Sequence, residues 1–382
     1  MIKARPEDFV VEEKADLPLR PAGEHRVYRL RKSGWNTDDL LKHLARAFGV
    51  SPSSFSYGGR KDKHGLTSQF IAISDPRDFS REGRNFALEA CGFMDRPMGP
   101  NLIRANAFRI TIRDLADPEA VARNLGDVRL SGVPNYFDDQ RFRSYDPERG
   151  FFAEKVLRRH WNGALQVYFA SIPSGTDGRE RERRKTLFEN WKNWPACLTL
   201  AAGPLEEKVF RYLRDHPREF ARALHLIPED EVAMQYAAYQ SHLWNEVLRR
   251  LVTKFVPSPA FVPGAEGGYP LWRDLDPGRK ALFEELWIPT AAVRMDIRED
   301  RVREGYEEVF REKAIGPAAF RTKALRNVYF KSFPRRALVV PEKIVVLGAS
   351  EDELHPGRKT FALSFELPRG SYATIVVKRL TL

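Results

Sequence analysis

The sequence predicts an α+β protein in which a more helical insertion interrupts a sheet-containing domain. Three observations support this. Strand and helix signals alternate over roughly the first 150 residues, helix signals dominate from there to about residue 335, and strand signals return near the end. We therefore expect one domain to combine residues 1–152 with 336–382, and the insertion to span 153–335. A chain of 382 residues is long enough for two or three domains with sizeable cores.

The first elements follow from apolar spacing and capping residues. Strands are expected over 9–13 and 25–32. A helix should come next, because Asn36 or Thr37 can cap its start and Gly49 can end it. Its apolar stripe consists of Leu40, Leu41, Leu44, Ala45 and Phe48.

The later elements are placed in the same way. Apolar residues alternate with polar ones at Phe108, Ile110 and Ile112, which predicts a half-buried strand, and Asp117-Pro118 should start a helix. A long helix is expected over 233–252, and further strands over 343–347 and 361–365. Two segments should be loops, 174–185 leading into a helix and the glycine-containing 261–269.

Composition limits the classes of function. Lys and Arg total 63 against 52 acidic residues, and the resulting charge of +11 suggests an acidic partner such as nucleic acid. The two cysteines exclude a disulfide framework or a cysteine-rich zinc site, and they fit a cytoplasmic protein. The N-terminal segment lacks the apolar core of a signal peptide, and no apolar run is long enough to cross a membrane.

Several common chemistries lack their motifs. The segment from Gly58 to Lys61 does not have the spacing of a phosphate-binding loop, and no Gly-x-Gly-x-x-Gly opens a helix. The eight histidines are scattered without metal-ligand spacing, and there is no Gly-x-Ser-x-Gly motif. We therefore expect no nucleotide cofactor and no metal, which leaves a cofactor-free RNA enzyme or a binding module.

The segment 55–70 holds one carboxylate, Asp62, among Arg60, Lys61 and Lys63, with glycines on both sides. Such an acid can be a salt-bridged turn residue. It can also be a catalytic carboxylate beside a phosphate-rich substrate, since nearby cations should keep its pKa low.

Three further segments suggest contact with RNA. Segment 133–142 combines polar side chains, including Asn135, with aromatic ones, including Phe137, and such a mixture can read unpaired bases. It can equally be a polar loop anchored by core aromatics. Segment 321–336 holds six basic residues and no acid, as a phosphate-binding patch or a solvated basic face would. In 367–377, a turn precedes Ser371 and Tyr372; a helix or a strand could follow, and Tyr372 could face a pocket or pack internally.

Together these motifs resemble the TruD family of tRNA pseudouridine synthases. The matching boxes are Lys3-Ala-Arg-Pro-Glu-Asp-Phe9, Gly59 to Gln69, Asn135 to Phe142, Gln240-Ser241 through Asn245, and Leu367 to Arg379, in order along the chain. The resemblance implies a pseudouridine synthase fold, with a mixed, largely antiparallel sheet flanked by helices. It also implies a TRUD-type insertion domain, a tRNA partner, and uridine 13 of the D-arm as the target.

The resemblance also implies roles for individual residues. Asp62 would be the catalytic aspartate, Lys3 the basic residue beside it, and Phe9 an aromatic wall of the pocket. Asn135 and Phe137 would position the target nucleotide. The base-stacking aromatic of the family is represented by Tyr372.

The implied reaction agrees with the motifs that are missing. Isomerisation of uridine breaks the N1–C1′ bond and forms a C5–C1′ bond, without redox chemistry or phosphoryl transfer. It needs a carboxylate near C1′ or C6, a means of holding the detached uracil, and an acceptor for the C5 proton. The carboxylate could act as a nucleophile or stabilise charge at C1′.

The sequence departs from the family pattern in the 135–142 box. Asp138 and Arg143 stand where the family has glycine, which reduces the backbone freedom of this loop and places an acid near a presumed RNA surface. An alternative is therefore an inactive RNA-binding protein of the same fold, acting as a tRNA chaperone. A metal-dependent nuclease is disfavoured because no second carboxylate lies near Asp62 in the sequence.

Overall fold

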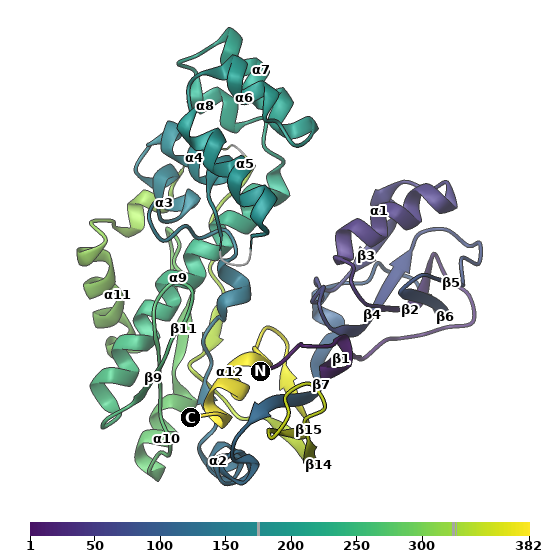
Figure 1. The fold of residues 1–382 in the computed structure, drawn as a ribbon, viewed down its shortest axis with the longest axis vertical. Helices are drawn as coiled ribbons and strands as arrows, with labels where there is room; N and C mark the ends of the chain where they lie inside the picture. The colour runs from purple at the N-terminus through teal and green to yellow at the C-terminus, as the bar shows by residue number, and fades with distance from the viewer. Residues whose placement is uncertain (174–175, 323–324, 326) are drawn as a thin grey trace. The chain divides into compact units, whose positions relative to one another are not determined.

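The computed structural model describes residues 1–173, 176–322, 325 and 327–382. The chain forms two compact units: unit 1 comprises 1–132 and 339–382, and unit 2 comprises 133–338 (Figure 1). The predicted fold class is confirmed, because a mixed, largely antiparallel sheet with flanking helices is combined with a more helical part. The chain passes from one unit to the other between residues 132 and 133 and between residues 338 and 339. The domain boundaries expected from the sequence were 152/153 and 335/336.

Unit 1 is built on one nine-stranded sheet, in the order β14-β15-β7-β1-β4-β2-β6-β5, with β3 also paired to β4. Only the β1–β4 pair is parallel. The strands are β1 (Phe9–Ala15), β2 (His25–Lys32), β3 (Phe55–Tyr57), β4 (Leu66–Ile73), β5 (Arg81–Gly83), β6 (Phe86–Met94), β7 (Ile103–Leu115), β14 (Glu342–Glu351) and β15 (Lys359–Pro368). The C-terminal strands therefore complete the sheet that the N-terminal strands begin.

Helix α1 (Thr37–Phe48) packs on this sheet by the stripe that the sequence predicted. Leu40, Leu41 and Leu44 join a buried cluster with side chains from β2, β4 and β6. Asn36 is the N-cap residue, and Gly49 ends the helix with a φ of 65°, the left-handed conformation that favours glycine. A second apolar cluster includes Val27 and other residues that alternate with the first set along the strands.

Two helices, one from each chain segment of unit 1, pack against each other. Helix α2 (Pro118–Ser131) begins as expected, with the Asp117 carboxylate accepting hydrogen bonds from the backbone N–H groups of Glu119 and Ala120. Helix α12 (Ala373–Leu380) packs against α2. The segment after Ser371 is therefore helical, with Tyr372 as its N-cap residue, and the strand alternative is wrong.

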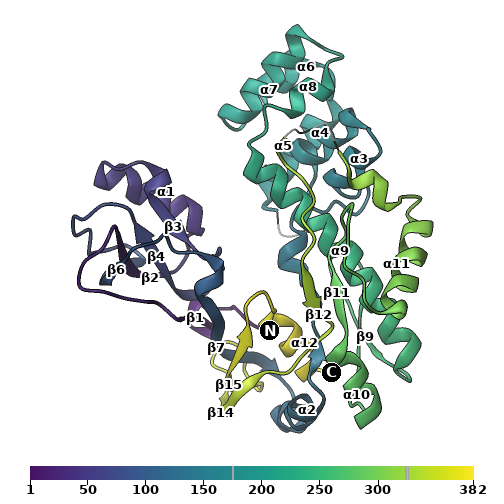
Figure 2. The ribbon, with the colours of Figure 1, turned by 180° about the vertical axis from the view of Figure 1, so that it is seen from behind.

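Unit 2 is mainly helical (Figure 2). Its longest helix, α9 (Glu229–Phe255), extends the predicted 233–252 helix at both ends and packs against α3 and α11. The helices are α3 (Phe152–Leu157), α4 (Trp161–Ala170), α5 (Gly178–Glu189), α6 (Trp194–Thr199), α7 (Pro204–Asp215), α8 (Phe220–Leu224), α9, α10 (Pro277–Glu285) and α11 (Asp300–Glu312). The short strands are β8 (Val133–Pro134), β9 (Ala260–Val262), β10 (Tyr269–Leu271), β11 (Trp287–Pro289), β12 (Pro334–Arg336) and β13 (Leu338–Val339).

Two predicted loops differ from the structure. Both ends of segment 261–269 belong to paired strands, β9 and β10, so only its glycine-rich middle is a loop. In segment 174–185 the helix α5 already begins at Gly178, because Asp177 accepts a hydrogen bond from the N–H of Glu180. Ser174 and Gly175 of that segment lie outside the described residues, as do Lys323 and Arg326 of the basic segment. Among the described residues, no helix has both the length and the apolar character needed to cross a membrane.

Candidate active site

Asp62 lies in the loop 58–65, which connects β3 to β4 in unit 1. Two glycines let this loop approach neighbouring chain closely. A Cβ on Gly65 would lie 2.3 Å from the backbone oxygen of Phe9, and one on Gly58 would lie 2.0 Å from the Cδ1 of Ile103. The parallel pairing that starts at Leu66 therefore depends on glycine at position 65.

The loop is held from α1 and β4 by hydrogen bonds. The hydroxyl of Thr37 accepts from the N–H of Lys61 at 3.1 Å and donates to the side-chain oxygen of Gln69 at 3.0 Å. The amide nitrogen of Gln69 donates to the carbonyl of Gly59 at 3.2 Å. Thr37 and Gln69 are both buried, so these bonds are protected from competition with water.

Lys32, at the end of β2, binds backbone carbonyls of the Asp62 loop. Its ammonium donates to the carbonyls of Trp35 and Asp62 at 2.8 Å each and of Lys61 at 3.3 Å. Burial lowers the pKa of Lys32 to about 8, while Asp62 acts in the opposite direction. Sequence reasoning missed this residue, although its spacing from Tyr28 and Leu30 places it on the buried side of the strand.

The Asp62 side chain is only 6% exposed and is held at both oxygens. Oδ2 forms an ion pair with the Nζ of Lys3 at 2.5 Å, and Oδ1 accepts from the N–H of His64 at 2.9 Å. The ammonium of Lys3 also lies 4.1 Å from the centre of the Phe9 ring. The structure thus brings Lys3, Phe9 and Asp62 together in unit 1.

The segment that carries Lys3 is anchored by Arg113 of β7. The Arg113 guanidinium pairs with Asp8 at 2.9 Å and with Asp352 at 3.0 Å. The backbone of Arg113 exchanges two hydrogen bonds of 2.7 Å with Met1. Hydrogen bonds and pairing with Asp8 and Asp352 outweigh the opposing effect of burial and raise the pKa of Arg113, so it stays charged. Lys3 itself has a φ of 66°, a left-handed conformation that such anchoring must hold in place.

The cations beside Asp62 differ from expectation. Lys61 pairs with Glu13 at 2.6 Å and donates to the side-chain oxygen of Asn106 at 2.8 Å. Arg60 pairs with Asp38 at 2.6 Å. Lys63 is exposed. Lys61 and Arg60 therefore pair with other acids, and Lys3, distant in sequence, contacts the Asp62 carboxylate.

The two aromatic residues predicted in unit 1 have different environments. Phe9 is buried, and its ring lies 6.0 Å from that of Phe108, which stacks on Phe365. Tyr372 is partly exposed at the start of α12, whereas Phe9 is buried.

Asn135 and Phe137 lie in unit 2, in the chain leading to the short 3₁₀ helix Asp139–Phe142. The guanidinium of Arg335 donates to the backbone oxygen of Asn135 at 2.8 Å and to its side-chain oxygen at 2.7 Å. The side-chain amide of Asn135 donates to the carbonyl of Arg336 at 3.0 Å. The same Arg335 lies 4.2 Å from the centre of the buried Phe137 ring. Both predicted residues therefore have their side chains engaged within unit 2.

Helix α9 holds the same loop from its other side. The side chain of Asn245 accepts from the N–H of Phe137 at 2.9 Å and donates to the carbonyl of Phe137 at 2.8 Å. The 135–142 and 240–245 boxes are thus linked, because the side chain of Asn245 binds the backbone of Phe137. The carboxylate of Asp139, the residue after the introduced acid Asp138, points inward, where it accepts from the N–H of Ala265 and the hydroxyl of Tyr269.

Within the described part of the chain, one group of side chains has the composition of a metal site: His242, Glu246 and Glu266. Arg249 pairs with Glu246 and Glu266 at 2.5 Å each, and His242 contacts Glu266 directly. Because Arg249 pairs with both carboxylates and Arg250 pairs with Glu246 as well, these residues fit an internal ion-pair cluster better than a metal site.

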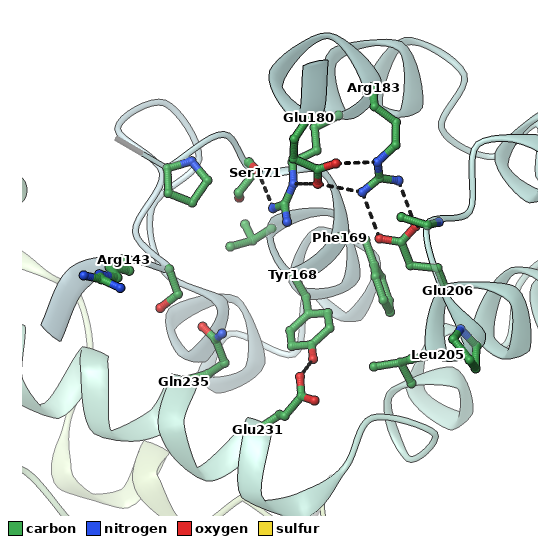
Figure 3. Close-up of a pocket in the computed structure, with 17 residues that line it drawn as sticks. Arg143, Tyr168, Phe169, Ser171, Glu180, Arg183, Leu205, Glu206, Glu231 and Gln235 are labelled. Carbon is green, nitrogen blue, oxygen red and sulfur yellow. Dashed lines mark hydrogen bonds and ion pairs between the residues drawn. The ribbon is translucent and has the colours of Figure 1, made fainter. Parts of the chain in front are cut away.

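A cavity of about 490 Å³ lies elsewhere in unit 2, between α4, α5, α7 and α9 (Figure 3). Arg183 and Arg184 from α5 pair with Glu180, and Arg183 also pairs with Glu206. None of the six predicted site residues lines this cavity. Arg143, which replaces a family glycine, lies at its edge.

Comparison with known families identifies the class of protein. A family model described as tRNA pseudouridine synthase D (TruD) matches residues 1–265 and 281–380. The chain therefore belongs to the tRNA pseudouridine synthase D family.

Individual relatives match nearly end to end. A tRNA pseudouridine synthase D from Leptospira interrogans is 26% identical over 402 aligned positions, covering 100% of this chain and 96% of that protein. A tRNA pseudouridine synthase D from Aquifex aeolicus is 27% identical, and the alignment covers 99% of this chain and 97% of that protein. The crystal structure of a putative tRNA pseudouridine synthase D from Methanosarcina mazei superposes with a TM-score of 0.69 at 23% identity, covering 100% of this chain and 93% of that one.

Proposed function

We propose that this chain isomerises uridine to pseudouridine in tRNA, with Asp62 as the catalytic carboxylate. Family membership supports an isomerase that acts on tRNA. The observation that carries the residue assignment is the Asp62–Lys3 pair: a nearly buried carboxylate, held at both oxygens, in the loop before β4, an interior strand of the unit 1 sheet. The target is uridine 13 of the D-arm, as the resemblance of the five sequence boxes implies.

The reaction uses Asp62 in its ionised form, for which the ammonium of Lys3 is the direct counter-charge. The carboxylate attacks the substrate or stabilises positive charge at C1′ while the N1–C1′ bond breaks. The uracil turns and C5 bonds to C1′; where the carboxylate had bonded to the substrate, that bond breaks and Asp62 leaves as a carboxylate. The proton on C5 passes to a base, and N1 takes up a proton. Atoms and charge balance without an oxidant or phosphoryl donor.

The remaining predicted residues divide into two kinds. Phe9 and Lys3 form the wall next to Asp62, and Tyr372 offers a partly exposed ring on which the detached uracil can stack. Asn135 and Phe137 act as positioning residues, because Arg335 and Asn245 use their polar groups to fix the 135–142 loop. The loop, rather than these two side chains alone, then meets the target nucleotide.

The test is purified protein with an unmodified tRNA transcript, followed by carbodiimide mapping of pseudouridine. Wild type should mark uridine 13, and a transcript with cytidine at position 13 should stay unmarked. Asp62→Asn keeps the size of the side chain and should abolish the mark. Asp95→Asn is a matched control, because it also removes the acid of an ion pair in unit 1, here the exposed pair with Arg20.

The outcomes separate the alternatives. Marking by Asp62→Asn at the wild-type rate would overturn the assignment of the carboxylate. A mark at another uridine would overturn the position but keep the activity. Tight tRNA binding without any mark, unchanged in Asp62→Asn, would favour the tRNA chaperone.

A further inference from the structure

Segment 329–336 of unit 2 presents different side chains on its two sides. Phe330 and Arg335 are buried: Phe330 stacks on Tyr236 with ring centres 4.2 Å apart, and Arg335 holds the 135–137 loop. Tyr329 and Phe333 are exposed by 64% and 47%. The inner residues therefore fix the backbone, and aromatic rings remain on the outer side.

A neighbouring strand adds a third exposed ring. Trp287 of β11 is directly opposite Arg336 of β12 and is 44% exposed. The pairing continues past the end of β11 and before the start of β12, since the N–H of Thr290 donates to the carbonyl of Phe333 at 3.0 Å. We refer to Trp287, Tyr329 and Phe333, with Lys331 and Arg336, as the aromatic strip.

Cations accompany the rings of the strip. The Arg336 guanidinium lies 4.9 Å from the centre of the Trp287 ring, and the Lys331 ammonium lies 5.2 Å from that of Tyr329. The sequence from 321 to 336 contains no acid. Exposed rings at one place cost solvation free energy unless a partner covers them, and the charge requires this partner to be anionic.

We propose that the aromatic strip binds unpaired nucleotides of the RNA substrate, with bases stacked on its rings and phosphates beside Lys331 and Arg336. Sequence-tolerant binding of single strands uses this combination of aromatic platforms and basic side chains. Base faces inside an A-form duplex are not available for stacking, so loops and ends are the parts that fit. The inference deepens the proposed function by locating a substrate contact outside the Asp62 site.

The experiment measures binding of unmodified tRNA by fluorescence anisotropy. Trp287→Ala, Tyr329→Ala and Phe333→Ala should each weaken binding, by roughly 5-fold to 100-fold if one stacked base is lost. Trp287→Phe keeps a ring and should stay close to wild type. Phe261→Ala is the matched control: Phe261 is 66% exposed on β9 of the same unit, and the strip does not include it.

Salt dependence distinguishes the rings from the cations. Lys331→Met and Arg336→Met should each reduce the slope of log K against log salt by about one, whereas the alanine variants should leave the slope unchanged. A single-stranded oligonucleotide should compete with tRNA, and a duplex of the same composition should compete less well.

Wild-type tRNA affinity in all three alanine variants would overturn the proposal. If light scattering then shows that the variants have an altered oligomeric state, the strip is a protein interface instead. Pseudouridine formation at saturating tRNA is measured in parallel, so that loss of the proposed function is recognised separately: weakened binding by the strip variants supports the strip even if wild type forms no pseudouridine.

Discussion

At the residue scale, the main feature is that Lys3 and Asp62 depend on each other. Each partner neutralises the other in a poorly hydrated place, so removal of one leaves a charge that is costly to bury. The sequence predicted that these two residues meet, because both stand in motifs of the family. It did not predict the partners of Lys61 and Arg60, since long flexible side chains can reach several acids and only the fold selects among them.

We expect Lys3→Met to lower the free energy of unfolding by about 1–3 kcal/mol, because Asp62 loses its counter-charge. Asp62→Asn in the same chain should recover part of this loss. Urea unfolding of the wild type, both single variants and the double variant gives the coupling free energy. A coupling near zero would show that the pair does not form in solution.

Lys32 gives a prediction for pH dependence. Its pKa is about 8 in the folded protein and 10.5 as a free side chain, so the unfolded state binds more protons between these values. The free energy of unfolding should therefore rise with pH from about 8 to 10.5, by at most about 1.4 kcal/mol per pH unit from this group.

The rate of pseudouridine formation should fall over the pH range in which the free energy of unfolding rises. The neutral amine has two N–H donors for three carbonyls, so the Asp62 loop loses support and the rate should fall above about pH 8. Comparison of wild type with Lys32→Met by urea unfolding and by carbodiimide mapping, from pH 7 to 10, checks both trends. Lys42→Met, at an exposed position of α1, is the control. Identical pH profiles in wild type and Lys32→Met would contradict the role of Lys32.

At the scale of elements, the sequence predicted the regular parts of the sheet and of α1 and α9, because apolar periodicity determines which side is buried. It was less successful where tertiary context decides. The β-branched run after Ser371 allowed a strand, yet the segment is helical because it packs on α2. The ends of 261–269 pair with each other, which residue-by-residue propensity does not reveal.

The glycines of the Asp62 loop provide a matched pair of variants. Gly65→Ala should lower the free energy of unfolding by about 1–3 kcal/mol and reduce activity, because the new Cβ would clash with the backbone of Phe9. Gly59→Ala should be nearly neutral for stability, since no atom lies within 4 Å of the added Cβ. Thermal or urea unfolding of both variants measures the difference. Equal effects would mean that the loop does not approach β1 as closely as described.

At the scale of the whole molecule, each unit has its own anchor for a functional segment. Arg113 ties the Lys3 segment to β7, and Arg335 ties the 135–137 loop to β12. Both arginines are buried and were not recognisable as anchors from the sequence, since their acceptors lie about one hundred or more positions away.

Hydrogen exchange should detect the two anchors separately. Arg113→Met should increase exchange in residues 1–8 and around Asp352, and leave 135–137 unchanged. Arg335→Met should do the reverse, because its hydrogen bonds to Asn135 and Tyr136 lie within unit 2. Mass spectrometry of peptides after deuterium labelling provides the measurement. Increased exchange in both segments from either variant would show that the units do not respond independently.

The open space at Gly59 also has a practical consequence. Cys197 is buried, and burial raises the pKa of its thiol to about 11, so it should react slowly with thiol reagents. After Cys91→Ser, a cysteine in place of Gly59 would be the single reactive position available for a fluorophore or spin label. Such a label would report on the Asp62 loop while RNA binds and leaves.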